Sequence, residues 1–420
     1  MDPLPSWAEG PPAQRSRMEA VMSRAVMLIG NRRRRVGVVV GGVSVVLALL
    51  AAPTSAQAQG SQRHGSDDDG FRQVNLVSDR TDIGAKVIDP AVKNPWGIAF
   101  GPQTPLWVSN NFNPASSPEP TKPSDLQVQI TVYTGANGKT KFQKVPLEVT
   151  ASAATGIVFN PTSQFKVKQV TNAPARFIFE EATFDPTAPG PPVPIAEISG
   201  WHPDNPLPTT TVVKAKRPGT FYTGLALVQT EKGPRLLAAA NPSGGIDIYD
   251  GNFKRLNRPH AYVDPSAQAE HLAPYNVVAL NGRVYVTYAN EQGGGGAVSV
   301  FTRDGRFIKR LVTGGVLNDP WGLAIAPEHW GEFGGALLVG NVDDGKINAF
   351  DPRSGRFRGT LSDSKGRPIV NLGLWGIEFG NGVIGTPQTL VFAAGIGDKN
   401  NNAVYEHGLV GLIVANDDDD

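Results

Sequence analysis

Four asparagines could carry chemistry because each ends an apolar segment at the same point of a repeated unit. They are Asn110, Asn241, Asn290 and Asn341. If these ends meet at one rim of the fold, their amide oxygens could hold a cation or bind sugar hydroxyl groups. The simpler interpretation is that each Asn bonds its own backbone to start a turn, since "NVDDG" and "NPSGG" are good turn sequences.

Acidic residues near the same rim could supply the charge of such a site. Glu180 and Glu181 directly follow the apolar "RFIF", and Asp343 and Asp398 fall in connections after two other apolar segments. A calcium-dependent hydrolase would need a carboxylate, amides from several repeats and a base. The alternatives are solvated acids at a strand end for the two glutamates, and a hairpin turn that favours Asp-Gly for Asp343.

These residues define a candidate ligand-binding set but no catalytic residue. The set comprises Asn110, Glu181, Asn241, Asn290, Asn341, Asp343 and Asp398. No metal ligand is assigned, and no cofactor is expected unless calcium binds this set. These residues do not decide whether the protein is an enzyme.

Several familiar catalytic patterns are missing from the sequence. The chain has no cysteine, which excludes thiol catalysis, thiolate metal sites and disulfides. Its six histidines include no pair with metal-ligand spacing, and no Gly-x-Ser-x-Gly occurs. The run Gly293 to Gly296 lies in a predicted hairpin rather than between a strand and a helix, so it is not a phosphate-binding loop.

The elements that position these residues are predicted to be short β-strands. After Gly70 the chain consists of apolar runs of four to seven residues, separated by Gly, Pro, Asn and Asp. Strict alternation of apolar and polar residues recurs in "RVYVTYAN", "QVQITVY" and "AVSVF". The 48 glycines and 35 prolines indicate many turns, and 40% hydrophobic residues are enough for a packed core. The fold class is therefore all-β.

An internal repeat organises these strands. Six copies of a four-strand unit follow one another at spacings of 46 to 68 residues. Their first strands are anchored at Gly97, Gly156, Gly224, Asn276, Gly322 and Gly376. Four-strand units at this period are typical of a β-propeller, so the sequence predicts a six-bladed propeller.

The unit Trp-Gly-apolar occurs three times, in "NPWGIAFGP", "NDPWGLAIAP" and "LWGIEFGNG". We expect it to begin innermost strands, where Gly permits close approach around the channel and Trp wedges between neighbouring blades. The last copy is one strand short, and "FRQVNLVS" (Phe71 to Ser78) precedes the first copy without a partner. Because a propeller must hide its sheet edges, this N-terminal strand is predicted to complete the sixth blade and close the ring.

Recurring segments carry a resemblance to a known family. "NLVSD", "NPWGIAFGP", "ISGWHPD", "GGIDIYDGNFK", "YNVVALNGRVYVTYA" and "LLVGNVDDGKINAFDPRSGRFRGTL" resemble exported bacterial six-bladed propellers of unassigned function, related to NHL-repeat propellers. The resemblance spans about residues 71–413 and implies a propeller without an agreed activity. Many members carry a C-terminal Pro-Glu-Pro sorting anchor, whereas the single Pro-Glu-Pro here is internal, at Pro118 to Pro120.

The N-terminal region predicts export. Arg32 to Arg35 precede a glycine-containing apolar run, and Ala56-Gln57-Ala58 matches a signal-peptidase site. A membrane anchor is the alternative, although the run is short for a bilayer. The predicted parts are 1–58 (extension and secretory signal), 59–70 (flexible linker), 71–415 (propeller) and 416–420 (acidic tail). We expect a secreted or periplasmic protein with no stable membrane anchor after cleavage.

The net charge of the chain and the lengths of its predicted loops indicate which kinds of partner to expect. Beyond residue 58 the chain holds 32 basic and 35 acidic residues, which predicts no nucleic-acid partner, and we expect a monomer. The connections after the second strands are long in the sixth, first and second repeats, and these blades are neighbours in a closed ring. Such a loop-rich face favours recognition, although loops also lengthen by drift.

The sequence therefore predicts a secreted, non-catalytic scaffold that binds an extracellular glycan or protein through the loop-rich face of blades six, one and two. The alternative is a calcium-dependent lactonase-like hydrolase with its site at the channel mouth.

Overall fold

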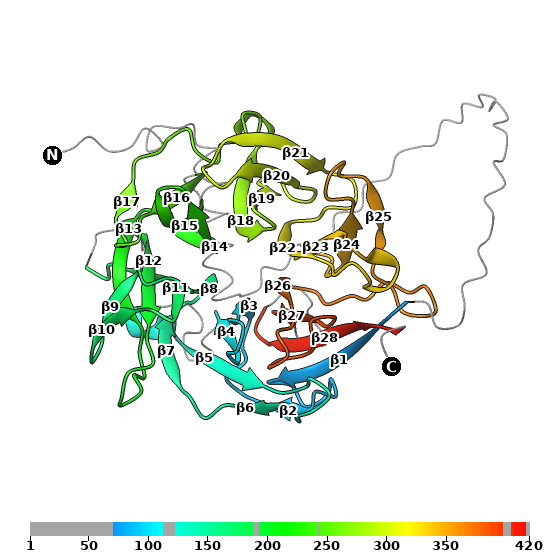
Figure 1. Cartoon of the computed structure of the whole chain (residues 1–420), viewed down its shortest axis with the longest axis horizontal. Helices are drawn as coiled ribbons and strands as arrows, with labels where there is room; N and C mark the ends of the chain where they lie inside the picture. Colours follow the sequence, from blue (N-terminus) through cyan, green and yellow to red (C-terminus); the bar gives the residue numbers. More distant parts are fainter. Residues whose placement is uncertain (1–69, 112–121, 188–192, 242–243, 398–404, 417–420) are drawn as a thin grey trace, which may run out of the picture.

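The computed structural model describes residues 70–111, 122–187, 193–241, 244–397 and 405–416 as an all-β protein. The helical segments in these ranges are short 3-10 turns: η3 (Pro123–Leu126), η4 (Gln268–Glu270) and η5 (Gly331–Phe333). Six sheets are arranged as blades around a central axis (Figure 1). The predicted fold class and blade number are confirmed.

Each blade begins with an inner strand at the axis and continues outward through antiparallel neighbours, except that the last strand of blade 6, β2 (Val87–Ile88), pairs parallel with β1 (Phe71–Ser78). Blade 1 contains β3 (Pro95–Ala99), β4 (Leu106–Asn110), β5 (Gln127–Thr134), β6 (Gln143–Lys144) and β7 (Val149–Ser152). Blade 2 contains β8 (Ile157–Phe159), β11 (Phe177–Phe184), β12 (Pro194–Trp201) and β13 (Val212–Pro218). A separate hairpin, β9 (Lys166–Lys168) and β10 (Asn172–Pro174), lies between β8 and β11 in the sequence.

The other blades repeat the four-strand order. Blade 3 contains β14 (Phe221–Thr230), β15 (Gly233–Asn241), β16 (Gly245–Tyr249) and β17 (Arg255–Leu256). Blade 4 contains β18 (Leu272–Leu280), β19 (Arg283–Asn290), β20 (Ala297–Thr302) and β21 (Phe307–Thr313). Blade 5 contains β22 (Pro320–Ile325), β23 (Leu337–Asn341), β24 (Ile347–Phe350) and β25 (Phe357–Thr360).

Blade 6 combines both ends of the described chain. It contains β26 (Leu374–Phe379), β27 (Leu390–Ala394), β28 (Leu409–Ala415), β1 (Phe71–Ser78) and β2 (Val87–Ile88). Strand β1 pairs antiparallel with β28 from Phe71 opposite Ala415 to Ser78 opposite Leu409. The ring is therefore closed by the N-terminal strand, as predicted, and this places blades 6, 1 and 2 side by side.

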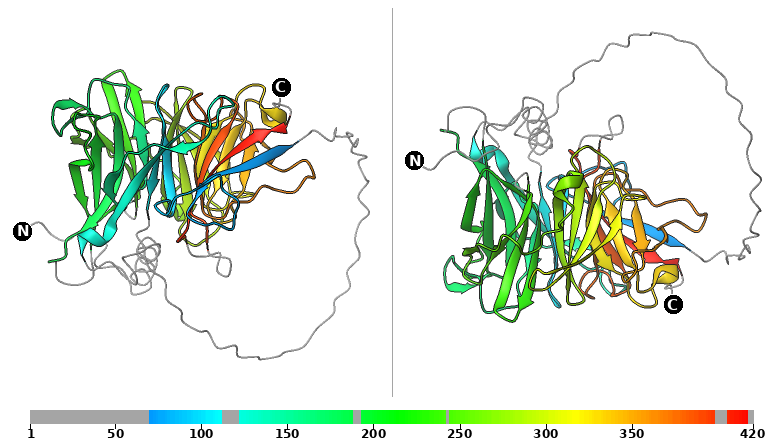
Figure 2. Two further views of the ribbon diagram at one scale, coloured as in Figure 1. Left: turned by 90° about the horizontal axis from the view of Figure 1, so that it is seen from below. Right: turned by 90° about the horizontal axis from the view of Figure 1, so that it is seen from above.

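The long strands of the blades run between two faces of the ring, which the side views show (Figure 2). We call the face at which inner strands begin the upper face. Second strands end there, because they are antiparallel to the inner strands: Asn110 lies opposite Pro95, and Asn341 opposite Pro320. Turns between third and outer strands lie on the opposite, lower face.

The inner strands approach one another closely where the repeat places its glycine. The backbone N–H of Gly97 donates to the carbonyl of Thr155 in the next blade at 3.1 Å, and a Cβ at Gly97 would lie 2.5 Å from that oxygen. Blade 4 has Asn276 at this position, and its amide nitrogen donates to the Trp321 carbonyl at 2.9 Å. The predicted role of these glycines in the packing of inner strands is confirmed.

Residues 1–69, which contain the predicted export signal and most of the predicted linker, lie outside the described residues. Within the described ranges, no helix is long and apolar enough to cross a lipid bilayer.

Candidate binding site at the centre of the upper face

The tryptophans of the repeated unit meet at the centre of the ring. The Trp96 and Trp375 rings stack with centroids 3.8 Å apart and an interplanar angle of 19°. Trp321 meets Trp375 edge to face at 5.9 Å. The prediction that each Trp wedges between blades was therefore incomplete, because residues at the start of inner strands also point toward the axis, where three indoles can pack together.

Three further aromatic residues extend this cluster across the axis. Phe221 of blade 3 meets Trp96 at 6.4 Å, and Tyr275 of blade 4 meets Trp375 at 6.0 Å. Tyr405, in the connection before β28, lies 6.1 Å from Trp375. We call the whole cluster the aromatic floor; its members are Trp96, Phe221, Tyr275, Trp321, Trp375 and Tyr405.

The aromatic floor joins five of the six blades at the upper end of the axis. A hydrogen bond of 2.7 Å from the Trp321 indole N–H to the Thr223 carbonyl links blade 5 to blade 3. The three indoles are buried, whereas Phe221, Tyr275 and Tyr405 are half-buried. The half-buried rings therefore supply the part of the floor that a ligand can contact.

Polar groups at the edge of the floor are only partly satisfied. Asn94 has a left-handed backbone (φ 43°), and its Oδ1 accepts the Trp375 indole N–H at 3.1 Å. Asn94 Nδ2 and Trp96 Nε1 are buried donors with no acceptor among the described residues. Buried donors are nearly always paired with protein or ordered water, so these two unpaired donors are unusual for a packed centre.

Three long connections leave the upper face around this centre. They join β4 to β5, β11 to β12, and β27 to β28. By contrast, β15 to β16 and β23 to β24 are joined by short turns. The unequal lengths follow the predicted pattern, and the closed ring makes the three long connections neighbours. Their central residues, 112–121, 188–192 and 398–404, lie outside the described residues.

The predicted asparagines stand at the upper rim, but hydrogen bonds to the backbone hold those that are described. Asn110 Nδ2 donates to the Gln129 carbonyl at 2.7 Å, and Asn341 Nδ2 donates to the Val316 carbonyl at 2.8 Å. Asn290 Oδ1 accepts the Gln292 backbone N–H at 2.9 Å, which forms a turn.

The oxygens Oδ1 of Asn110 and Asn341 are buried without a partner among the described residues. Asn241 ends β15 opposite Phe221, and its side chain is not described. A ligand-binding role for these asparagines stays a prediction.

The acidic candidates are not brought together. Asp343 is exposed in the turn after β23, and Asp398 lies outside the described residues. Glu180 and Glu181 are both buried in β11, so the alternative of solvated strand-end acids was wrong. A second strand of a propeller is covered on both faces by neighbouring blades. Its side chains are therefore shielded from solvent even where the residues are polar.

Glu181 is held at the junction of blades 1 and 2. Its carboxylate accepts hydrogen bonds from the Ser152 backbone N–H at 2.8 Å, the Thr211 hydroxyl at 2.6 Å and the Ser199 hydroxyl. Burial raises the pKa of Glu181, and the three hydrogen bonds oppose this rise. This carboxylate has little remaining capacity for a ligand.

Glu180 faces the junction of blades 2 and 3. Its Oε2 lies 2.5 Å from the place where a Cβ at Gly156 would stand, so the inner-strand glycine makes room for it. The Thr155 hydroxyl donates to Oε2 at 3.4 Å, and Oε1 has no partner among the described residues. Burial raises the pKa of Glu180 well above its usual range, which favours the protonated form.

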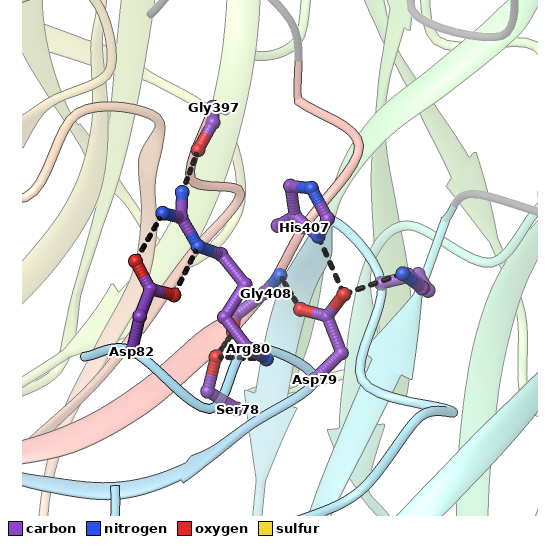
Figure 3. A network of polar contacts seen from close by, with 8 residues as sticks. Ser78, Asp79, Arg80, Asp82, Gly397, His407 and Gly408 are labelled. Atoms are coloured by element: carbon purple, nitrogen blue, oxygen red, sulfur yellow. Dashed lines mark hydrogen bonds and ion pairs between the residues drawn. The ribbon is translucent and has the colours of Figure 1, made fainter. Parts of the chain in front are cut away.

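A polar cluster at the upper rim ties the chain ends to this site (Figure 3). The Asp79 carboxylate accepts from the Gly408 backbone N–H at 2.8 Å and contacts the His407 ring at 2.6 Å. It also forms an ion pair with Lys93, just before the inner strand of blade 1. Arg80 donates to the Gly397 carbonyl at 2.6 Å. The connection that carries Tyr405 is thus anchored at both ends to β1 and its following turn.

Sequence reasoning missed Phe221, Tyr275 and Tyr405 as site residues. A signal was present for one of them, because Tyr275 directly precedes the anchor Asn276, at the position that Trp holds in the three Trp-Gly copies. No group of three His, Asp or Glu side chains in the described part of the chain is placed to hold a metal ion.

The fold and the closed ring define the chain as a six-bladed β-propeller. Among solved structures it is similar to the α-L-arabinofuranosidase Arb93A from Fusarium graminearum, with a TM-score of 0.51 and 10% identity. That likeness covers 82% of this chain and 98% of the other. At this identity the likeness shows the fold alone.

Sequence comparison places the chain in a family. It is 31% identical over 321 residues to the uncharacterized protein R648 of Acanthamoeba polyphaga mimivirus, covering 72% of both chains. A second mimivirus protein, the uncharacterized protein L690, is 37% identical over 145 residues, which cover 31% of this chain and 38% of the relative. The chain therefore belongs to the family of the uncharacterized mimivirus protein R648, and no family model matches it. Membership of an exported bacterial family stays a prediction.

Proposed function

We propose that this protein is a secreted, non-catalytic propeller that binds a glycan at the centre of its upper face. The aromatic floor is the observation that carries this proposal. It presents the half-buried rings of Phe221, Tyr275 and Tyr405 over a buried layer of three indoles.

Sugar rings suit such a surface because they combine apolar C–H faces with many hydroxyl groups. Aromatic faces bury apolar area with specific geometry, and binding sites pair such surfaces with a few polar groups that fix orientation. The phenolic hydroxyls of the half-buried Tyr275 and Tyr405 are polar groups of this kind. The three long connections around the floor can add contacts that select one glycan over another.

A panel of immobilised neutral glycans, probed with the full chain, tests the proposal. Any glycan that binds should then change the tryptophan fluorescence on titration, because three of the seven tryptophans lie in the aromatic floor. Saturable binding with a fluorescence change supports the proposal. The absence of binding to the whole panel, or binding without a fluorescence change, contradicts it.

A calcium-dependent hydrolase is the second candidate, and one observation favours it: the buried Glu180 carboxyl has an oxygen without a partner. The described residues do not otherwise fit a calcium site, because Glu181 is saturated by protein donors and no acidic cluster forms. Metal analysis of the purified full chain separates the two candidates. Stoichiometric calcium that disappears in the Glu180→Gln variant would favour the hydrolase.

A further inference from the structure

Two neighbouring blades carry the same arginine-rich turn on the lower face. In blade 4 the turn reads Arg303-Asp-Gly-Arg306-Phe, and in blade 5 it reads Arg353-Ser-Gly-Arg356-Phe. Each connects a third strand to an outer strand, β20 to β21 and β24 to β25, so both lie opposite the aromatic floor. The repeat therefore places two pairs of arginines at equivalent positions. We call them the paired arginine turns.

The turn of blade 5 packs against β21, the outer strand that directly follows the turn of blade 4. The Lys309 ammonium of β21 donates to the Arg353 carbonyl in the turn of blade 5. Gly355 packs so closely on β21 that an added Cβ would lie 2.0 Å from the Leu311 carbonyl. The outer strands β21 and β25 follow one another along the rim of the ring (Figure 1).

This surface has an excess of positive charge. The segments 302–309 and 351–358 contain six Lys and Arg residues and two Asp residues. The Asp351 carboxylate is occupied by its own turn, since it accepts the Ser354 backbone N–H at 2.6 Å and the Ser354 hydroxyl at 2.8 Å. It acts on Arg356 only through its charge. Such an excess attracts anions.

The guanidinium groups are available for a partner. Arg303, Arg306, Arg353 and Arg356 are exposed, and none of them forms an ion pair with a residue that the structure describes. Apolar side chains lie among them, with Phe357 44% exposed and Ile308 39% exposed. A planar guanidinium binds carboxylates and sulfates through two parallel hydrogen bonds.

We infer that the paired arginine turns bind an acidic polysaccharide. A repeated pair of arginines in adjacent blades suits a ligand whose negative charges also repeat, and the exposed Phe357 and Ile308 suit the apolar faces of sugar rings. This second surface lies on the face opposite the aromatic floor and does not depend on it. The protein would thereby hold a charged polymer on one face and a neutral glycan on the other.

Isothermal titration of the full chain with polygalacturonate (carboxylate) and dextran sulfate (sulfate) tests the inference, with neutral dextran as the uncharged control. The double variant R306Q/R356Q should bind the acidic polymer about tenfold more weakly, equivalent to about 1.4 kcal/mol. The matched control K166Q/K168Q removes the same charge from exposed lysines of β9, in the separate hairpin between β8 and β11, and should bind as the wild type does.

Equal weakening by the two double variants would overturn the inference, because it would show attraction by net charge alone. Equal binding of neutral dextran would overturn it as well. So would tighter binding of single-stranded DNA that R306Q/R356Q abolishes, since the surface would then serve a nucleic acid. None of these results bears on the aromatic floor, whose binding is followed separately by tryptophan fluorescence.

Discussion

Replacing Phe71 by alanine should lower the free energy of unfolding by about 3–5 kcal/mol. Phe71 begins β1, is 2% exposed, and packs against Trp330 and Phe333 of blade 5 with ring centroids 4.6 and 5.7 Å apart. Burying a phenylalanine removes about 150 Å² from water, which at about 25 cal/mol per Å² is about 4 kcal/mol. The closed ring leaves a cavity in place of the missing side chain.

Urea unfolding followed by circular dichroism measures this effect on the full chain. The matched control is Phe357→Ala in β25, where the phenylalanine is 44% exposed. We expect it to cost about 1–2 kcal/mol, because less area is buried and no closed cavity forms. If Phe71→Ala costs no more than Phe357→Ala, strand β1 is not seated in blade 6, and the closed ring on which the site depends is refuted.

Three further results are expected. Gly224→Ala should cost about 1–3 kcal/mol, because its Cβ would lie 2.0 Å from Asn276 Oδ1, whereas Gly245→Ala, with open space around its Cβ, should be nearly neutral in the same urea assay. Asp79→Asn should cost about 1–3 kcal/mol, since its carboxylate is 2% exposed, pairs with Lys93 and accepts the Gly408 backbone N–H; an unchanged urea midpoint would show that the polar cluster does not hold the chain ends. Burial raises the pKa of Glu378 from 4.5 to about 8. The folded state therefore favours the neutral carboxyl, and the stability that this carboxyl contributes is complete below pH 4.5 and is lost as the pH rises through about 8. The variant Glu378→Gln should therefore gain stability over the wild type between these pH values in urea unfolding, and a constant difference across the range would contradict the assignment.

Most of the fold could be predicted because a propeller repeats its signals. Gly97, Gly322 and Gly376 stand in three "WG" units at inner strands, and the missing sixth-blade strand left one partner for Phe71 to Ser78. Strand alternation and turn residues act locally, so they can be read from a single chain. The order of blades follows once the repeats are counted, and with it the grouping of the three long connections.

The site was harder to predict because it depends on where side chains point. Asn110 and Asn341 stand at the predicted rim, yet their amide nitrogens turn to nearby backbone carbonyls. Glu180 looks like a surface acid in the sequence, and only the packing of blade 3 beside Gly156 buries it. Contacts across the axis, such as that of Tyr275 with Trp375, join residues of non-adjacent blades. No local sequence pattern encodes such contacts.

The affinity of the aromatic floor for a glycan tests the proposed function most directly. Isothermal titration should compare the wild type with Tyr275→Ala and with the control Phe357→Ala, using a neutral glycan that binds on the panel. Tyr275 is a half-buried ring of the floor, whereas Phe357 lies on an outer strand. We expect at least about tenfold weaker binding for Tyr275→Ala, equivalent to about 1.4 kcal/mol, and wild-type affinity for Phe357→Ala. Unchanged affinity in Tyr275→Ala, with the fold intact by circular dichroism, would contradict it.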